Sequence, residues 1–173
     1  MTKTLLILLF FIATLQAKML ISPIDAMHAM YGDDAVVSKK NILLNKTQAK
    51  QVQHAAQTKL DTKIYRIFRA TKDDKVLGYG ILINRKVRSK NAVTLYMIAK
   101  STLLGIEIIA FNEPSEYIPT SQWQEQFKDI DTSKNLQLNR NIPTITGATL
   151  SARSITDGSR IAFALYNTLY KGK

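Results

Sequence analysis

The sequence predicts an α+β domain with a central antiparallel sheet flanked by helices. Three observations favour this class. Short apolar or β-branched runs joined by polar turns fill residues 64–111, helical patterns stand on both sides of that region, and an amphipathic helical pattern ends the chain. Runs at such short spacing are typical of an antiparallel meander. At 173 residues the chain is long enough for one domain with its own core.

Two helices are expected before the sheet. Residues 18–40 form a mixed segment, in which residues 24–30 suit a short helix and a polar turn follows at 31–34. Thr47 is expected to cap a second helix that ends near Leu60, because its hydroxyl can accept a free amide hydrogen of the first turn. The buried side of this helix is expected to carry Val52, Ala55, Ala56 and Leu60.

Four strands are expected next, over residues 64–70, 76–83, 92–99 and 103–111. The turns between them are expected at Asp73-Asp74, in a highly charged loop at 84–91, and at 100–102. Gly78 and Gly80 flank Tyr79 inside the second run. Since glycine weakens a strand interior, this pair predicts either a β-bulge or the close approach of a flat group.

The region after the strands combines a short helix, a polar loop and the final helix. Ser121 and Gln124 have the spacing of a capping box, and Trp123 and Phe127 share one helical face. Residues 129–141 are polar and are expected to form a loop. The last helix is expected over residues 152–170.

The N-terminus has the layout of a secretory signal peptide. A positive start, Met1-Thr2-Lys3, precedes an apolar run over residues 5–15, and Ala17 is a suitable cleavage residue. The run is shorter than the roughly 20 residues that span a bilayer. We therefore expect a signal peptide at 1–17 and a single domain at 18–173 in the periplasm or another extracytoplasmic space. The alternative is a short uncleaved anchor.

The composition of the chain excludes some kinds of site and limits the kinds of partner. The formal net charge is +11, and an excess of this size often indicates nucleic acid. The export signal argues against that partner and favours anionic lipid head groups, an acidic redox protein, or a solvated surface with no partner. Without cysteine, the chain can form no disulfide, thiolate metal site or iron–sulfur cluster. His28 and His54 lack the spacing of metal ligands, and no nucleophilic catalytic set is indicated.

The main candidate site is the hexapeptide Thr146-Gly147-Ala148-Thr149-Leu150-Ser151, directly before the last helix. A small-residue, hydroxyl-rich turn that leads into a helix N-terminus suits a phosphate group, because free N–H groups and the positive end of the helix dipole meet there. The other interpretation is an ordinary capping turn.

This hexapeptide is similar to the Ser/Thr-Gly-Ala-Thr-x-Ser/Thr signature of the FMN-binding domain family. The family includes flavin subunits of the Rnf and sodium-pumping NADH:quinone oxidoreductase complexes and the periplasmic domain of NosR-type proteins. The resemblance extends over roughly residues 60–170, with Gly78-Tyr79-Gly80 and Asn112-Glu113-Pro114. It implies FMN bound covalently through a phosphoester to Thr149, attached by a dedicated flavin transferase.

The resemblance also implies roles for neighbouring residues. Thr146, Ser151 and the first amides of the helix, including that of Leu150, would hold the phosphodiester, while Gly147 and Ala148 leave room for it. Glu113 is the candidate polar contact to the flavin or its ribityl chain, with a surface-turn carboxylate as the alternative. The family's Glu-Thr-Pro-Gly sequence is replaced here by Glu113-Pro114. The candidates for the ring slot are aromatic, with core packing as the alternative: Tyr79, Tyr117, Trp123 and Phe127.

Together these features predict an exported electron-transfer flavoprotein, a carrier rather than a stand-alone enzyme, that exchanges electrons with donor and acceptor redox proteins. Two alternatives remain open. One is a flavin-dependent reductase of a small extracytoplasmic acceptor, and the other is a cofactor-free interaction module with a basic surface.

Overall fold

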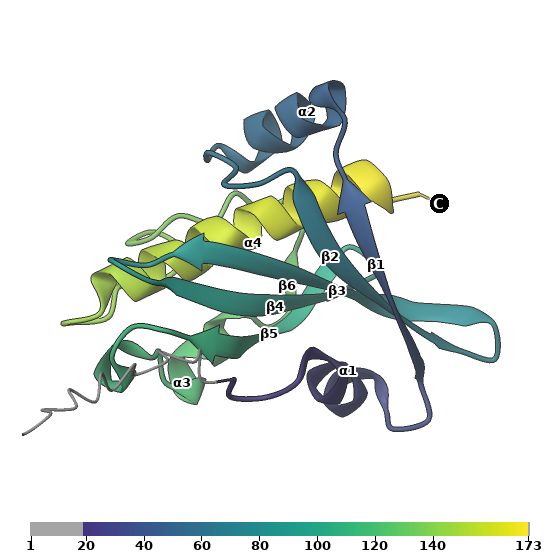
Figure 1. The fold of residues 1–173 in the computed structure, drawn as a ribbon, viewed down its shortest axis with the longest axis horizontal. Coiled ribbons are helices and arrows are strands. Elements are labelled where there is room, and N and C mark those ends of the chain that lie inside the picture. The colour runs from purple at the N-terminus through teal and green to yellow at the C-terminus, as the bar shows by residue number, and fades with distance from the viewer. Residues whose placement is uncertain (1–18, 173) are drawn as a thin grey trace, which may run out of the picture.

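The computed structural model describes residues 19–172, and a six-stranded antiparallel sheet is its centre (Figure 1). The strands lie in the order of the sequence: β1 (Val36–Leu43), β2 (Ile64–Lys72), β3 (Lys75–Lys86), β4 (Asn91–Ala99), β5 (Thr102–Phe111) and β6 (Ile130–Asp131). The α-helices are α1 (Pro23–Tyr31), α2 (Lys46–Ala56), α3 (Ser121–Gln124) and α4 (Thr149–Leu169), with short 3-10 turns η1 (Ser115–Tyr117) and η2 (Glu125–Phe127). The predicted α+β class, with a C-terminal helix after the motif, is confirmed.

Tight two-residue turns join the central strands. Asp73 and Asp74 have φ of 48° and 59°, and Lys100 and Ser101 have φ of 48° and 63°. Two successive positive φ values are typical of the type I′ turn, whose twist matches that of the paired strands. These turns therefore fix the registers of β2 with β3 and of β4 with β5.

The two faces of the sheet have separate apolar cores. On β2, Tyr65 and Ile67 belong to the larger cluster, which α2 and α4 complete. Phe68 and Ala70 point to the opposite face, where α1 covers a smaller cluster. Figure 1 shows α4 running across one side of the sheet and α1 on the other. The alternation of side chains along β2 is the period-two pattern of a strand that is buried on both faces.

Gly78 and Gly80 allow α1 to lie close to the sheet. A Cβ on Gly78 would come within 2.5 Å of the Tyr31 hydroxyl oxygen, and a Cβ on Gly80 would collide with Met27 Sδ. The Tyr31 hydroxyl donates to the carbonyl oxygens of Tyr79 (3.3 Å) and Ile98 (3.2 Å). A register shift also occurs opposite Gly78, between Ala70 and Thr71. Both predicted reasons for the glycine pair are thus present, with the Tyr31 ring as the flat group.

A similar close contact seats α4 on the sheet. Gly158 faces the hydroxyl of Tyr96, a β4 side chain that is 1% exposed. That hydroxyl donates to the Ile155 carbonyl oxygen over 2.7 Å. Because the glycine leaves room for the phenol, the middle of α4 is held against β4, and this contact sets where the start of the helix lies.

Several local predictions were wrong. Asn45, not Thr47, caps α2 and forms a capping box with Gln48, and the helix ends at Ala56. Thr120, not Ser121, caps α3 through the amide of Trp123. Strands β1 and β6 were not predicted, and β3 continues to Lys86 inside the expected charged loop.

The predicted signal peptide, residues 1–17, lies outside the described residues. Within residues 19–172, no helix has the length and apolar character needed to cross a bilayer.

Candidate functional site

The motif forms a tight turn that leads directly into α4. The amide of Ala148 donates to the Ile145 carbonyl oxygen over 3.0 Å, and Gly147 has φ of +80°. A positive φ at the third position is what a type II turn requires, and it favours glycine. No atom lies within 4 Å of a Cβ built on Gly147. The glycine is therefore needed for its backbone conformation and leaves open space in front of the turn.

The first turn of α4 has unused hydrogen-bond donors. Ala148 is the N-cap residue, and no side chain caps the helix. Among residues 19–172, nothing accepts the amide hydrogens of Thr149, Leu150 or Ser151. The simple capping-turn interpretation is therefore wrong for this helix. Three free amides at the positive end of a 21-residue helix form a site for an oxyanion.

The hydroxyl of Thr149 is exposed at the edge of this site. It donates to the Ile145 carbonyl oxygen over 3.3 Å, which is a long contact. The oxygen lone pairs remain available to form a bond to an incoming group. Ser151, which is 1% exposed, is buried behind the same turn, and Thr146 is exposed on its outer side.

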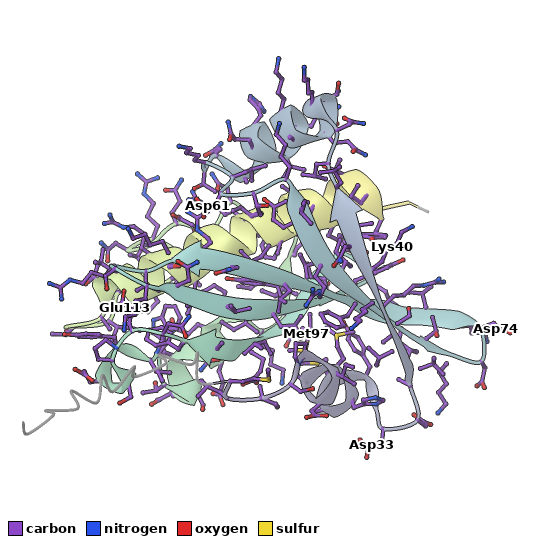
Figure 2. The ribbon with its side chains drawn as sticks, viewed as in Figure 1. Asp33, Lys40, Asp61, Asp74, Met97 and Glu113 are labelled. Carbon is purple, nitrogen blue, oxygen red and sulfur yellow. The ribbon has the colours of Figure 1, made fainter. Side chains whose placement is uncertain are left out.

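A pocket of about 240 Å³ opens in front of these donors. It brings the motif together with two predicted neighbours from elsewhere in the chain, Glu113 and Tyr117. Figure 2 shows Glu113 at the end of the molecule where α4 begins. The full lining is Val87, Arg88, Glu113, Tyr117, Gly147, Ala148, Thr149, Leu150 and Ser151.

Glu113 organises one wall of the pocket. Its Oε1 accepts the backbone amides of Arg88 (3.1 Å), Ser89 (2.5 Å) and Lys90 (2.7 Å), and the Ser89 hydroxyl donates to both carboxylate oxygens. The amide of Lys90, followed by the other donors, holds the pKa of Glu113 below its ordinary value. The carboxylate is thus an anion whose main work is to fix the β3–β4 loop.

Arg88 is a pocket residue that the sequence reasoning missed. It sits in the predicted charged loop, and it takes part in no ion pair within the described chain. A guanidinium at this position is a side chain that suits a phosphate group, and it stands at the same pocket as the Glu113 carboxylate.

The two remaining aromatic candidates near the motif lie in the core. Trp123 is 7% exposed, and its ring lies 5.2 Å from the fully buried ring of Phe127. The indole Nε1 donates to the Pro143 carbonyl oxygen over 3.0 Å. Trp123 therefore anchors the segment that precedes the motif, as the core-packing alternative predicts, and it does not line the pocket.

Tyr79 is also far from the motif. Its ring stacks on Tyr170, just beyond the last residue of α4, with centroids 4.2 Å apart. The 21 residues of α4 place about 30 Å between this end and Thr149. The prediction that Tyr79 and the motif share one site is therefore wrong.

Asp157 and Arg160 form a largely buried ion pair on α4. Arg160 contacts Asp157 over 2.5 Å, and Arg85 from β3 lies 3.8 Å from the same carboxylate. The two arginine side chains are 15% exposed, and their Nε atoms are buried without a hydrogen-bond partner. This group ties α4 to β3 below the pocket.

The fold and the site together define an α+β domain with an oxyanion-type pocket at the start of its last helix. No protein-family model matches the chain, and no curated protein matches it. The resemblance to the FMN-binding domain family therefore stays a prediction from the sequence motif.

Proposed function

We propose that the protein is an exported, periplasmic electron-transfer flavoprotein that carries FMN through a phosphoester on Thr149. The observation that carries the proposal is the exposed Thr149 hydroxyl beside three unused helix amides, in a pocket that also contains Arg88. This combination offers both an attachment atom and a counter-charge for a phosphodiester.

The donor set fits the phosphate end of FMN. The amides of Thr149, Leu150 and Ser151 would donate to the phosphate oxygens, and Arg88 would balance their charge. Gly147 and Ala148 leave the approach open. Glu113 would act by holding the Arg88 loop in place, because its Oε1 already accepts three amides. Bound FMN would supply one- or two-electron redox chemistry, which none of the twenty side chains offers in this way.

The size of the pocket suits a cofactor whose flavin ring stays exposed. At about 240 Å³ it is smaller than the roughly 300–1,000 Å³ of ordinary ligand sites. It would enclose the phosphate end and leave the rest of the cofactor near the surface, where a partner protein can approach. A covalent bond retains a cofactor that is too exposed to be held by burial alone. We propose redox proteins as electron donor and acceptor, and a flavin transferase for maturation.

The test is coexpression of the full chain, exported to the periplasm, with a flavin transferase. After denaturation, yellow fluorescence is expected to remain with the polypeptide, and its mass is expected to rise by one FMN less one water. Sequencing of the periplasmic protein is expected to begin near Lys18. Thr149→Ala is expected to abolish attachment, and Thr149→Ser to retain it, because the hydroxyl is kept.

The matched control is Thr146→Ala. Thr146 belongs to the same motif and is also exposed, yet it does not line the pocket. It is expected to slow attachment at most. Melting curves of each variant confirm folding. Covalent flavin on Thr149→Ala would refute the assigned residue, and a folded, colourless wild type would favour the cofactor-free module. Turnover of one small acceptor without a protein partner would favour the reductase.

A further inference from the structure

A second pocket lies at the opposite end of α4 from the motif. It has a volume of about 370 Å³, within the range of small-molecule sites. Its walls come from the first three strands and from the end of the last helix. The lining residues are Ser38, Lys40, Ile42, Ile67, Arg69, Tyr79, Leu169 and Tyr170.

The cations of this pocket have no acidic partner in the described chain. Lys40 and Arg69 stand on neighbouring strands, and both face the side of the sheet that α4 covers. The ion pairs formed within residues 19–172 involve neither of them. Figure 2 shows Lys40 on β1 beside the C-terminal end of α4. Two cations in one pocket with no carboxylate create a local positive potential that favours an anion.

Arg69 also lies close to the aromatic part of the pocket. Burial raises the pKa of the Tyr170 hydroxyl, and the positive charge of Arg69 partly opposes that shift. The rings of Tyr79 and Tyr170 stack with an angle of 26° between their planes. Both tyrosines are only half-buried, so ring surface remains accessible from the pocket. Ile42, Ile67 and Leu169 supply apolar contacts around the stacked pair.

We propose that this pocket binds a small planar organic carboxylate. The guanidinium of Arg69 has the forked geometry that holds a carboxylate through two parallel hydrogen bonds, and Lys40 adds a second charge. The apolar wall and the tyrosine rings accept a flat ring, which stacks in an offset or edge-to-face arrangement. The site is independent of the proposed flavin, because about 30 Å of helix separates the two pockets.

The experiment titrates the full-length mature chain with naphthoate by calorimetry, with naphthamide as the uncharged analogue. Arg69→Gln and Lys40→Gln are each expected to weaken naphthoate binding about tenfold or more, as expected for a lost charged hydrogen bond. The matched controls are Arg66→Gln and Lys39→Gln. They lie on the same two strands and remove the same charge, but they point to the other face of the sheet.

The controls are expected to change the affinity less than about twofold, since a distant exposed charge is largely screened. Equal weakening by the controls would overturn the proposal, as would naphthamide binding as tightly as naphthoate. Absence of naphthoate binding up to about 10 mM would overturn it too. Circular dichroism shows whether Arg69→Gln folds. If it does not fold, Lys40→Gln tests the contribution of positive charge to naphthoate binding. Tyr170→Leu tests the contribution of ring stacking and is expected to lose affinity.

Discussion

Replacement of Trp123 by alanine tests whether this residue holds the motif through the core or contacts the cofactor directly. The indole is 7% exposed, packs on Phe127, and donates to the Pro143 carbonyl oxygen over 3.0 Å. Loss of a buried aromatic residue costs about 3–5 kcal/mol. Total stabilities of domains are about 5–15 kcal/mol, so Trp123→Ala is expected to remove about a fifth or more of the free energy of unfolding.

The assay is thermal unfolding followed by circular dichroism, together with the emission of the flavin-loaded protein. For a chain of this size each kcal/mol lowers Tm by about 2–4 °C, so a drop of about 6–20 °C is expected. Trp123→Phe keeps an aromatic ring and loses the Nε1 hydrogen bond, which is worth about 1 kcal/mol. Its loss of stability is therefore expected to be less than half that of the alanine variant.

Flavin emission of the folded Trp123→Ala protein is expected to stay unchanged, because the indole does not line the pocket. An unchanged Tm with a rise in flavin emission would refute this reasoning and move Trp123 from the core to the cofactor contacts.

Two further variants test the contacts that place the site. Gly158→Ala is expected to destabilise the protein by about 1–3 kcal/mol in urea unfolding, because the new methyl group collides with the Tyr96 hydroxyl. This cost exceeds the roughly 1 kcal/mol that alanine gains over glycine in helix propensity. The same change made in the Tyr96→Phe protein is expected to cost at least about 1 kcal/mol less, and an equal cost would show that the hydroxyl is not the cause. The pKa of Glu113 is lowered in the folded state. The carboxylate therefore stabilises the fold fully above the unfolded-state pKa of about 4.3, and this stabilisation is lost as the pH falls through the folded-state pKa. Acid titration from about pH 6 to 2 is therefore expected to destabilise the wild type more than Glu113→Gln, and parallel curves would contradict that role.

The strands that could be predicted from the sequence are those whose buried side chains form apolar runs. β2 to β5 are buried on at least one face, so their apolar residues are visible as runs. β1 is different, because it is an edge strand whose centre, Ser38-Lys39-Lys40-Asn41, is exposed and polar. Such a strand is held by its backbone pairing with β2, and no apolar pattern marks it in the sequence.

Helix starts were harder to locate because several residues near each start could serve as caps. Asn45 and Thr47 both suit the start of α2, and only the backbone geometry selects Asn45.

The candidate site was predictable where it is local in sequence. The motif identified the turn, the helix start and the attachment residue as one unit. Tyr117 and Glu113 reach it because the β4–β5 hairpin returns the chain to the end of the sheet at which α4 begins. Arg88 enters through the backbone bonds of its loop to Glu113, a long-range contact that no spacing reveals. Tyr79 was assigned to the wrong site because its neighbours Gly78 and Gly80 make room for side chains of α1 and not for a cofactor.

The packing of α1 has a consequence for the order in which the molecule is assembled. This helix is the first described element to be synthesised, yet the side chains that it covers come from strands completed much later, among them Phe68, Leu95 and Ile109. Contacts at such long separation in sequence form slowly. Until the sheet is complete, α1 has no surface to bind and one apolar face of the nascent sheet stays bare. Exposed faces of this kind are where folding intermediates aggregate. The packing of α1 therefore covers an apolar face of the sheet that would otherwise stay exposed during folding.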